Sequence, residues 1–114
     1  MKKFLILYSM PHDGMEEWMK KDEAERKTAE EKMKADWDAW MAEHKDMILE
    51  TAGAGKMTKV TQGISEDSHN DIMLYGLVQG ESKETVAKLF ETHPHLGIPG
   101  SWIEVMEANL LPQM

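Results

Sequence analysis

The sequence predicts an α+β domain in which strands and helices follow the order β-α-β-β-α-β over residues 1–114. Residues 3–9 and 71–79 carry apolar side chains at both alternating positions, as strands covered on both faces do. Two longer segments repeat apolar residues at helical spacing. Residues 56–64 are rich in β-branched side chains, and residues 101–108 alternate as a final strand does.

Composition restricts the class of protein. A length of 114 residues suits one domain with a single core. A hydrophobic content of 41% and a charged content of 30% are typical of soluble globular proteins. The net charge of −8 argues against nucleic acid or an anionic membrane as partner, since both need a basic surface. The lack of cysteine excludes disulfides and thiol chemistry, and it fits a reducing compartment.

We expect neither a targeting segment nor a membrane segment in this sequence. The apolar run near its start, residues 4–8, is shorter than the core of a secretory signal and fits a first strand better. No segment approaches the roughly 20 apolar residues of a membrane span. We therefore expect a cytoplasmic protein. The eleven methionines are expected to fill the core, or alternatively to form an adaptable apolar pocket or subunit interface.

The first half of the chain is rich in charge. Residues 13–27 are expected to form a short helix or an irregular lead-in. "TAEE" predicts a capping box that starts a helix at Thr28, with Glu31 reaching back. Gly53 is expected to end this helix, and the alternative is one continuous helix from about Asp22. Its predicted buried face carries Met33, Trp37, Trp40, His44, Met47 or Ile48, and Thr51.

The second half contains the remaining elements. Residues 56–64 are polar on both faces and are expected to form an edge strand, followed by a turn at "SEDSHN". Ser82 is the predicted cap of a second helix, with Glu84 near its positive end. Pro94 should stop this helix, and residues 109–114 are a tail after the last strand. The predicted buried face of the helix that Ser82 caps carries Val86, Leu89, Phe90 and His93.

These elements predict a ferredoxin-like fold. The short "SEDSHN" connection makes its neighbouring strands an antiparallel hairpin, and each helix joins its strands by a right-handed crossover. The antiparallel four-stranded sheet then has the spatial order 4-1-3-2, with two helices on one face. Its central strands are residues 3–9 and 71–79, which the apolar pattern marks independently. Because the second face of these strands is also apolar, we expect a homodimer that packs sheet against sheet.

This topology gathers polar side chains at one end of the sheet, where they form a candidate site. The side chains expected there are Tyr8, His12, Ser68, His69, His93 and His95. His44 is expected elsewhere, in a structural role. His95 is the better site candidate, because His93 lies on the buried face of the helix and fits a core histidine. Glu104 either faces a cavity or is an exposed carboxylate on an edge strand.

The expected function is that of a cofactor-independent enzyme acting on a small apolar or cyclic acid, bound in a cleft at one end of the sheet that is walled by Tyr8, Trp37, Trp40 and methionines. A cofactor-independent enzyme would use His95 or His93 as general acid–base, since imidazole titrates near neutral pH. The alternative is a non-catalytic small-molecule-binding or accessory protein. No cofactor is expected, because phosphate-loop and dinucleotide glycine patterns are lacking. The His-Pro-His spacing alone is too common to predict a metal site.

Several stretches are similar to a known family. "HPHL", "SWIEVMEA", the opening "KKFLILYS" and "DWDAWM" before a G-x-G turn together resemble the YCII-related (DGPF-domain) family. The resemblance implies a ferredoxin-like dimeric α+β barrel. Enzyme members proposed in the family use a histidine early in the first long helix and an aspartate near the hairpin. The matching stretch "KADWDAWM" contains no histidine, and "SEDSHND" lacks the Asp-Gly-Pro-Phe pattern.

The two histidines of "THPHLGIPG" are expected to differ. His93 should be largely buried against the sheet, because it continues the apolar face of the preceding helix. Pro94 should turn the chain so that His95 is at least partly accessible to solvent. His95 should also lie within reach of the end of the first strand, near Tyr8 to His12.

Overall fold

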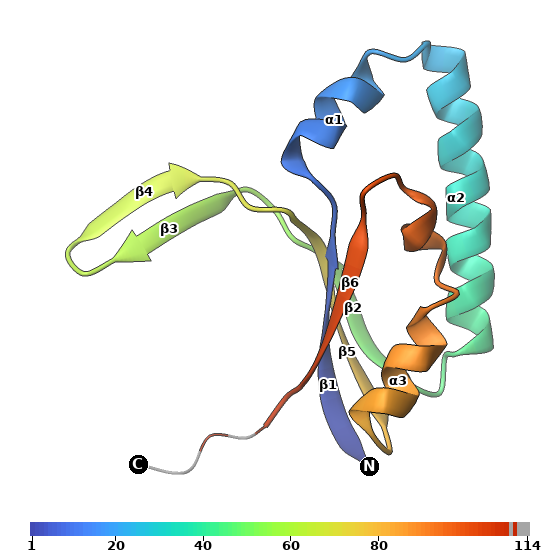
Figure 1. Cartoon of the computed structure of the whole chain (residues 1–114), viewed down its shortest axis with the longest axis vertical. Helices are drawn as coiled ribbons and strands as arrows, with labels where there is room; N and C mark the ends of the chain where they lie inside the picture. Colours follow the sequence, from blue (N-terminus) through green and yellow to red (C-terminus); the bar gives the residue numbers. More distant parts are fainter. Residues whose placement is uncertain (110, 112–114) are drawn as a thin grey trace.

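The computed structural model describes residues 1–109 and 111, and all of their side chains except that of Met15. Most of the predicted tail at 109–114 therefore lies outside the described residues. Four strands form the main sheet: β1 (Lys2–Ser9), β2 (Ile48–Gly53), β5 (Ile72–Gly80) and β6 (Trp102–Glu107). They pair antiparallel in the order β2-β5-β1-β6. The two segments expected to be central, β1 and β5, do lie in the centre (Figure 1).

The predicted ferredoxin-like fold is wrong, because the described chain has six strands in two sheets and three α-helices. β3 (Met57–Thr61) and β4 (Ile64–Ser68) form a separate two-stranded hairpin that projects from the main sheet (Figure 1). The predicted edge strand at 56–64 and turn at 65–70 fall on this hairpin. Gly63 explains the difference: its φ of 79° permits the tight connection between the two strands.

The edge of the main sheet is instead formed by β2, from a segment expected to belong to the first long helix. That helix, α2 (Glu23–Glu43), ends earlier than predicted, so Gly53 is a strand residue and not a helix cap. Residues 47, 48 and 51 matched helical spacing. In β2, however, Ile48 and Thr51 pair with Val78 and Gly76 of β5. Pairing with the apolar central strand outweighs the local helical pattern.

The predicted capping box at Thr28 is also wrong. α2 begins at Glu23 after Asp22, which confirms the alternative of one continuous helix from about residue 22. Carboxylates in the first turn, Glu23 and Glu25, favour this start because they face the positive end of the helix dipole. Thr28 lies one turn inside the helix, where its Oγ1 donates to the carbonyl oxygen of Ala24 at 3.0 Å.

Three further helical segments complete the chain: α1 (His12–Met19), α3 (Lys83–Phe90) and a 3-10 turn, η1 (Pro94–Gly97). The predicted cap of α3 is confirmed, since Ser82 Oγ accepts from the Thr85 backbone N–H at 3.1 Å. α3 ends at Phe90, and Pro94 opens η1, where its fixed φ suits the first helical position.

The core lies between the main sheet and the helices α2 and α3, which cover the same face (Figure 1). Its buried side chains are Phe4, Ile6, Tyr8, Trp40, Val78, Val86 and Phe90. The strand register places a second apolar set on the opposite face, around Leu5 and Leu7 of β1. Their cross-strand partners on that face are Tyr75, Leu77, Glu104 and Met106. No described helix covers this face.

Candidate functional site

His95 lies at the end of β1, as predicted. Its ring Nε2 is 2.8 Å from the carbonyl oxygen of Ser9, and because a carbonyl only accepts, Nε2 is the donor. The expectation of partial solvent access is wrong, since His95 is only 1% exposed. Pro94 does redirect the chain, but into η1, and this turn points the imidazole inward at β1.

His93 is 2% exposed, which confirms its predicted burial. Its Nδ1 accepts from the backbone N–H of His95 at 3.0 Å, so the ring proton resides on Nε2. This Nε2 is buried and has no hydrogen-bond partner among the described residues. Burial, together with the nearby imidazoles of His95 and His44, lowers the pKa of His93 from 6.5 to about 4. His93 is therefore neutral at pH 7.

The three aromatic side chains expected to wall a cleft surround His93. The ring centroids of Trp37 and Trp40 are each 4.4 Å from that of His93, and the Tyr8 centroid is 5.1 Å away. Burial raises the pKa of the Tyr8 phenol, so it stays protonated at neutral pH. The structure thus brings five predicted site residues together, as a packed aromatic cluster between β1, α2 and η1.

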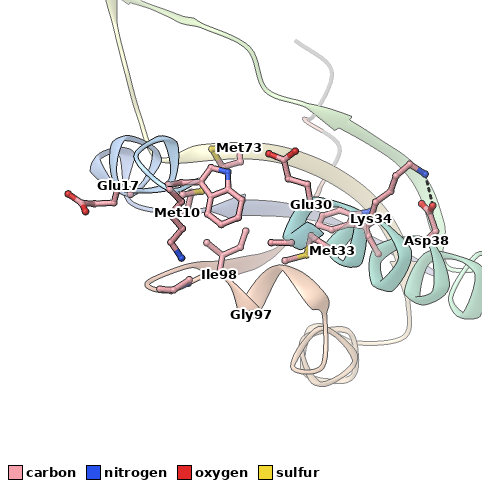
Figure 2. A pocket seen from close by; sticks show the side chains of 15 residues that line it. Met10, Glu17, Glu30, Met33, Lys34, Asp38, Met73, Gly97 and Ile98 are labelled. Atoms are coloured by element: carbon pink, nitrogen blue, oxygen red, sulfur yellow. Dashed lines mark hydrogen bonds and ion pairs between the residues drawn. The ribbon is translucent and has the colours of Figure 1, made fainter. Parts of the chain in front are cut away.

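A cavity of about 740 Å³ lies beside this cluster. It is lined by α1, the middle of α2 (residues 29–38), the loop after η1, and residues at the ends of β1 and β5 (Figure 2). Its size falls within the range of small-molecule sites in proteins. The apolar walls are Met10, Gly14, Trp18, Ala29, Met33, Trp37, Met73, Gly97, Ile98 and Pro99. The charged lining residues are Glu17, Lys21, Glu30, Lys34 and Asp38.

Trp37 belongs both to the cavity wall and to the aromatic cluster around His93. It lines the cavity, and its ring also contacts His93 at a centroid distance of 4.4 Å. Tyr8 and Trp40 lie within the core and do not line the cavity. Among the described residues no histidine lines it either. Of the three aromatic wall residues predicted from the sequence, Tyr8, Trp37 and Trp40, only Trp37 therefore lines the cavity.

Sequence reasoning missed most of the cavity wall. Trp18 was visible as one of the few large apolar residues in the charged segment 13–27, and that segment forms α1 over one side of the cavity. The expectation of a methionine-rich pocket, held as an alternative to core filler, fits Met10, Met33 and Met73. These three residues are distant in sequence, so only the fold shows that they share one cavity.

The remaining candidates lie outside the cavity. His12 and His69 are exposed and stack with ring centroids 4.0 Å apart, between the start of α1 and the end of the hairpin. Ser68 is exposed at the end of β4. Glu104 is exposed on the uncovered face of the sheet, where it accepts from Trp102 Nε1 at 3.4 Å. Its position fits the exposed carboxylate expected as the alternative.

The described residues contain neither a cluster that could hold a metal ion nor a helix that could span a membrane. In the part of the chain that the structure describes, no group of three or more His, Cys, Asp or Glu side chains could hold a metal ion. None of the described helices is both long and apolar enough to cross a membrane.

Comparison with known proteins identifies no family for this sequence. No protein-family model matches the sequence, and a search of curated proteins finds no match. The resemblance to the YCII-related family therefore stays a prediction.

Proposed function

We propose that the protein binds a small, mainly apolar molecule in the cavity between α1 and α2, without transforming it. The observation that carries the proposal is the cavity itself, which has a volume of about 740 Å³. Trp18, Trp37 and three methionines supply most of its large apolar side chains. Indole rings contribute large apolar contact areas, and flexible thioethers adapt to the shape of a bound molecule.

The positions of the histidines favour binding over acid–base catalysis. A general base must lie within hydrogen-bond reach of the proton that it removes. His95 Nε2 already donates to Ser9, and His93 Nδ1 already accepts from the His95 backbone. Trp37, which lines the cavity, contacts the His93 ring, and neither His93 nor His95 is itself a lining residue. A molecule in the cavity therefore meets apolar walls and carboxylates or lysines, but no imidazole.

A cavity-filling substitution tests the proposal. Ala29 lies on α2 and lines the cavity, so Ala29→Phe should occupy the space that a ligand needs. Ala35 is exposed on the same helix and lies outside the lining, which makes Ala35→Phe a matched control. Decan-1-ol can be titrated into each protein while tryptophan fluorescence is recorded.

We expect the wild type and Ala35→Phe to bind decan-1-ol with similar affinity. Ala29→Phe should bind it at least about tenfold more weakly, because a phenyl group displaces several ligand methylenes, each contributing about 0.8 kcal/mol. Equal binding by all three proteins would place the ligand elsewhere. No fluorescence response in the wild type, with this or other apolar probes, would contradict the proposal.

We also propose that the protein acts as a homodimer joined through the uncovered face of the main sheet. Leu5, Leu7, Tyr75 and Leu77 line this face on the two central strands. On the same side projects the β3–β4 hairpin, against which no described element packs extensively (Figure 1). An isolated two-stranded hairpin is only marginally stable in water. In a dimer with one twofold axis, each copy would cover the uncovered sheet face and the β3–β4 hairpin of the other.

Sedimentation of the wild type and of Leu7→Lys tests the dimer. Leu7 lies on the uncovered face, and a lysine there would place two charges at a two-fold interface. The wild type should sediment as a dimer at micromolar concentration, and Leu7→Lys as a folded monomer. A wild-type monomer would contradict the proposal.

We also propose a cytoplasmic location, which the cysteine-free sequence supports.

A further inference from the structure

We infer that the cavity between α1 and α2 selects a hydrophobic cation, an alkylamine or quaternary ammonium with an apolar tail. The inference rests on the proposed binding function and narrows it to one class of ligand. The first support for this inference is the pair of tryptophans in the cavity wall. Trp18 and Trp37 both line the cavity, and the faces of indole rings attract cations. Lys21 Nζ already lies 5.4 Å from the Trp18 ring centroid, so this wall holds an ammonium group even without ligand.

The second support is the state of the charged residues around the cavity. Lys34 is engaged by Asp38, with Nζ and Oδ2 2.8 Å apart (Figure 2). The hydrogen bond and the charge of Asp38 raise the pKa of Lys34 and hold its ammonium group in that pair. Glu30, in contrast, has no hydrogen-bond or ion-pair partner among the described residues. The other lining carboxylates have partners, Lys20 at 3.5 Å for Glu17 and Lys34 for Asp38. Glu30 is thus the one open to a cation among the described lining residues.

The third support is the unsuitability of the cavity for an anion. Both lining lysines already have partners, Asp38 for Lys34 and the Trp18 ring for Lys21. Methionine sulfurs are polarizable, accept hydrogen bonds only weakly and donate none, so they cannot solvate a carboxylate. The net charge of −8 also raises the local concentration of cations and lowers that of anions. Charge and chemistry therefore favour the same class of ligand.

Three probes with the same ten-carbon tail separate charge from hydrophobicity: decyltrimethylammonium, decan-1-ol and decanoate. The two ionic probes are titrated below their micellar concentrations and decan-1-ol below its solubility limit, at pH 7 and low salt, and binding is followed by tryptophan fluorescence and calorimetry. We expect the cation to bind about tenfold more tightly than the alcohol, the size expected for one cation–π contact together with one exposed carboxylate. Decanoate should bind more weakly than either.

The substitution Glu30→Gln tests the assigned carboxylate. It should weaken decyltrimethylammonium binding about three- to fivefold and leave decan-1-ol binding unchanged, because only the charge is removed. Glu31→Gln, at the next and exposed position of α2, lies outside the cavity lining and should change neither affinity. Ala29→Phe should weaken both probes, which distinguishes the cavity from surface adsorption of the cation.

The outcomes separate this inference from the proposed function. If the alcohol binds as tightly as the cation, or decanoate binds most tightly, the charge preference is wrong and the apolar site remains. If Glu30→Gln and Glu31→Gln weaken the cation equally, general surface charge is responsible and the assignment to Glu30 is wrong. If none of the probes binds, the proposed function itself fails.

Discussion

Acidification should destabilise this protein through one buried imidazole, that of His93. The ring is 2% exposed and packs among Tyr8, Trp37, Trp40 and Phe90, and no carboxylate of the described residues raises its pKa. Protonation would also remove the hydrogen bond that Nδ1 accepts from the His95 backbone. The folded protein therefore keeps His93 neutral to a lower pH than the unfolded chain does.

The size of the effect follows from the two pKa values. In the folded protein the pKa of His93 is lowered from 6.5 to about 4, mainly by burial and then by the imidazoles of His95 and His44. Above pH 6.5 both states hold His93 neutral and the contribution to stability is complete. As the pH falls from 6.5 towards 4, the unfolded state binds the proton first. Stability then falls by about 1.4 kcal/mol per pH unit, roughly 3 kcal/mol over the window.

Urea unfolding at a series of pH values between 4 and 7.5 measures this loss. The comparison is with His93→Asn, which does not titrate and whose Oδ1 can still accept from the His95 N–H. The free energy of unfolding of the wild type should fall more steeply than that of the variant below pH 6.5, and the two slopes should agree above it. Parallel curves over the whole range would refute the reasoning. An NMR titration that gave His93 a pKa near 6.5 would refute it as well.

Two further substitutions test the packing of the fold. Gly80→Ala should lower the free energy of unfolding by about 1–3 kcal/mol in urea unfolding, because the new Cβ would lie 2.5 Å from Val86 Cγ2; Gly53→Ala, with open space around it, should change stability by less than about 0.5 kcal/mol. Ser82→Ala should cost about 1 kcal/mol by losing the cap of α3, whereas Ser82→Asn should retain most of the stability. A neutral Gly80→Ala or Ser82→Ala would show that the β5–α3 junction is looser than described.

The sequence predicted the features that depend on local pattern. Two-sided apolar character identifies β1 and β5 as central strands, because burial on both faces requires apolar residues at every position. The Ser82 cap is equally local, since it needs only a hydroxyl at the start of an amphipathic helix. The burial of His93 follows from its place one turn beyond Phe90 and two turns beyond Val86.

The features that sequence reasoning missed depend on distant contacts. Ile48 and Thr51 fit a helix and a strand equally well, and only pairing with β5 decides between them. The inward turn of His95 needs the Ser9 carbonyl, which is 86 residues away in sequence. The cavity joins Trp18 and Met33 to Ile98, three positions whose proximity no spacing pattern can indicate.

The most direct test of the cavity as a binding site uses the four tryptophans of the chain as reporters. Trp18 and Trp37 line the cavity, Trp40 is buried in the core, and Trp102 lies on the uncovered face of the sheet. Each contributes one indole N–H signal to a ¹H–¹⁵N spectrum, and assigned spectra can be recorded during a titration with decan-1-ol. A ligand in the cavity should shift the Trp18 and Trp37 signals most and leave that of Trp102 unchanged. Shifts confined to Trp102, or no shift at saturating probe, would contradict binding in this cavity.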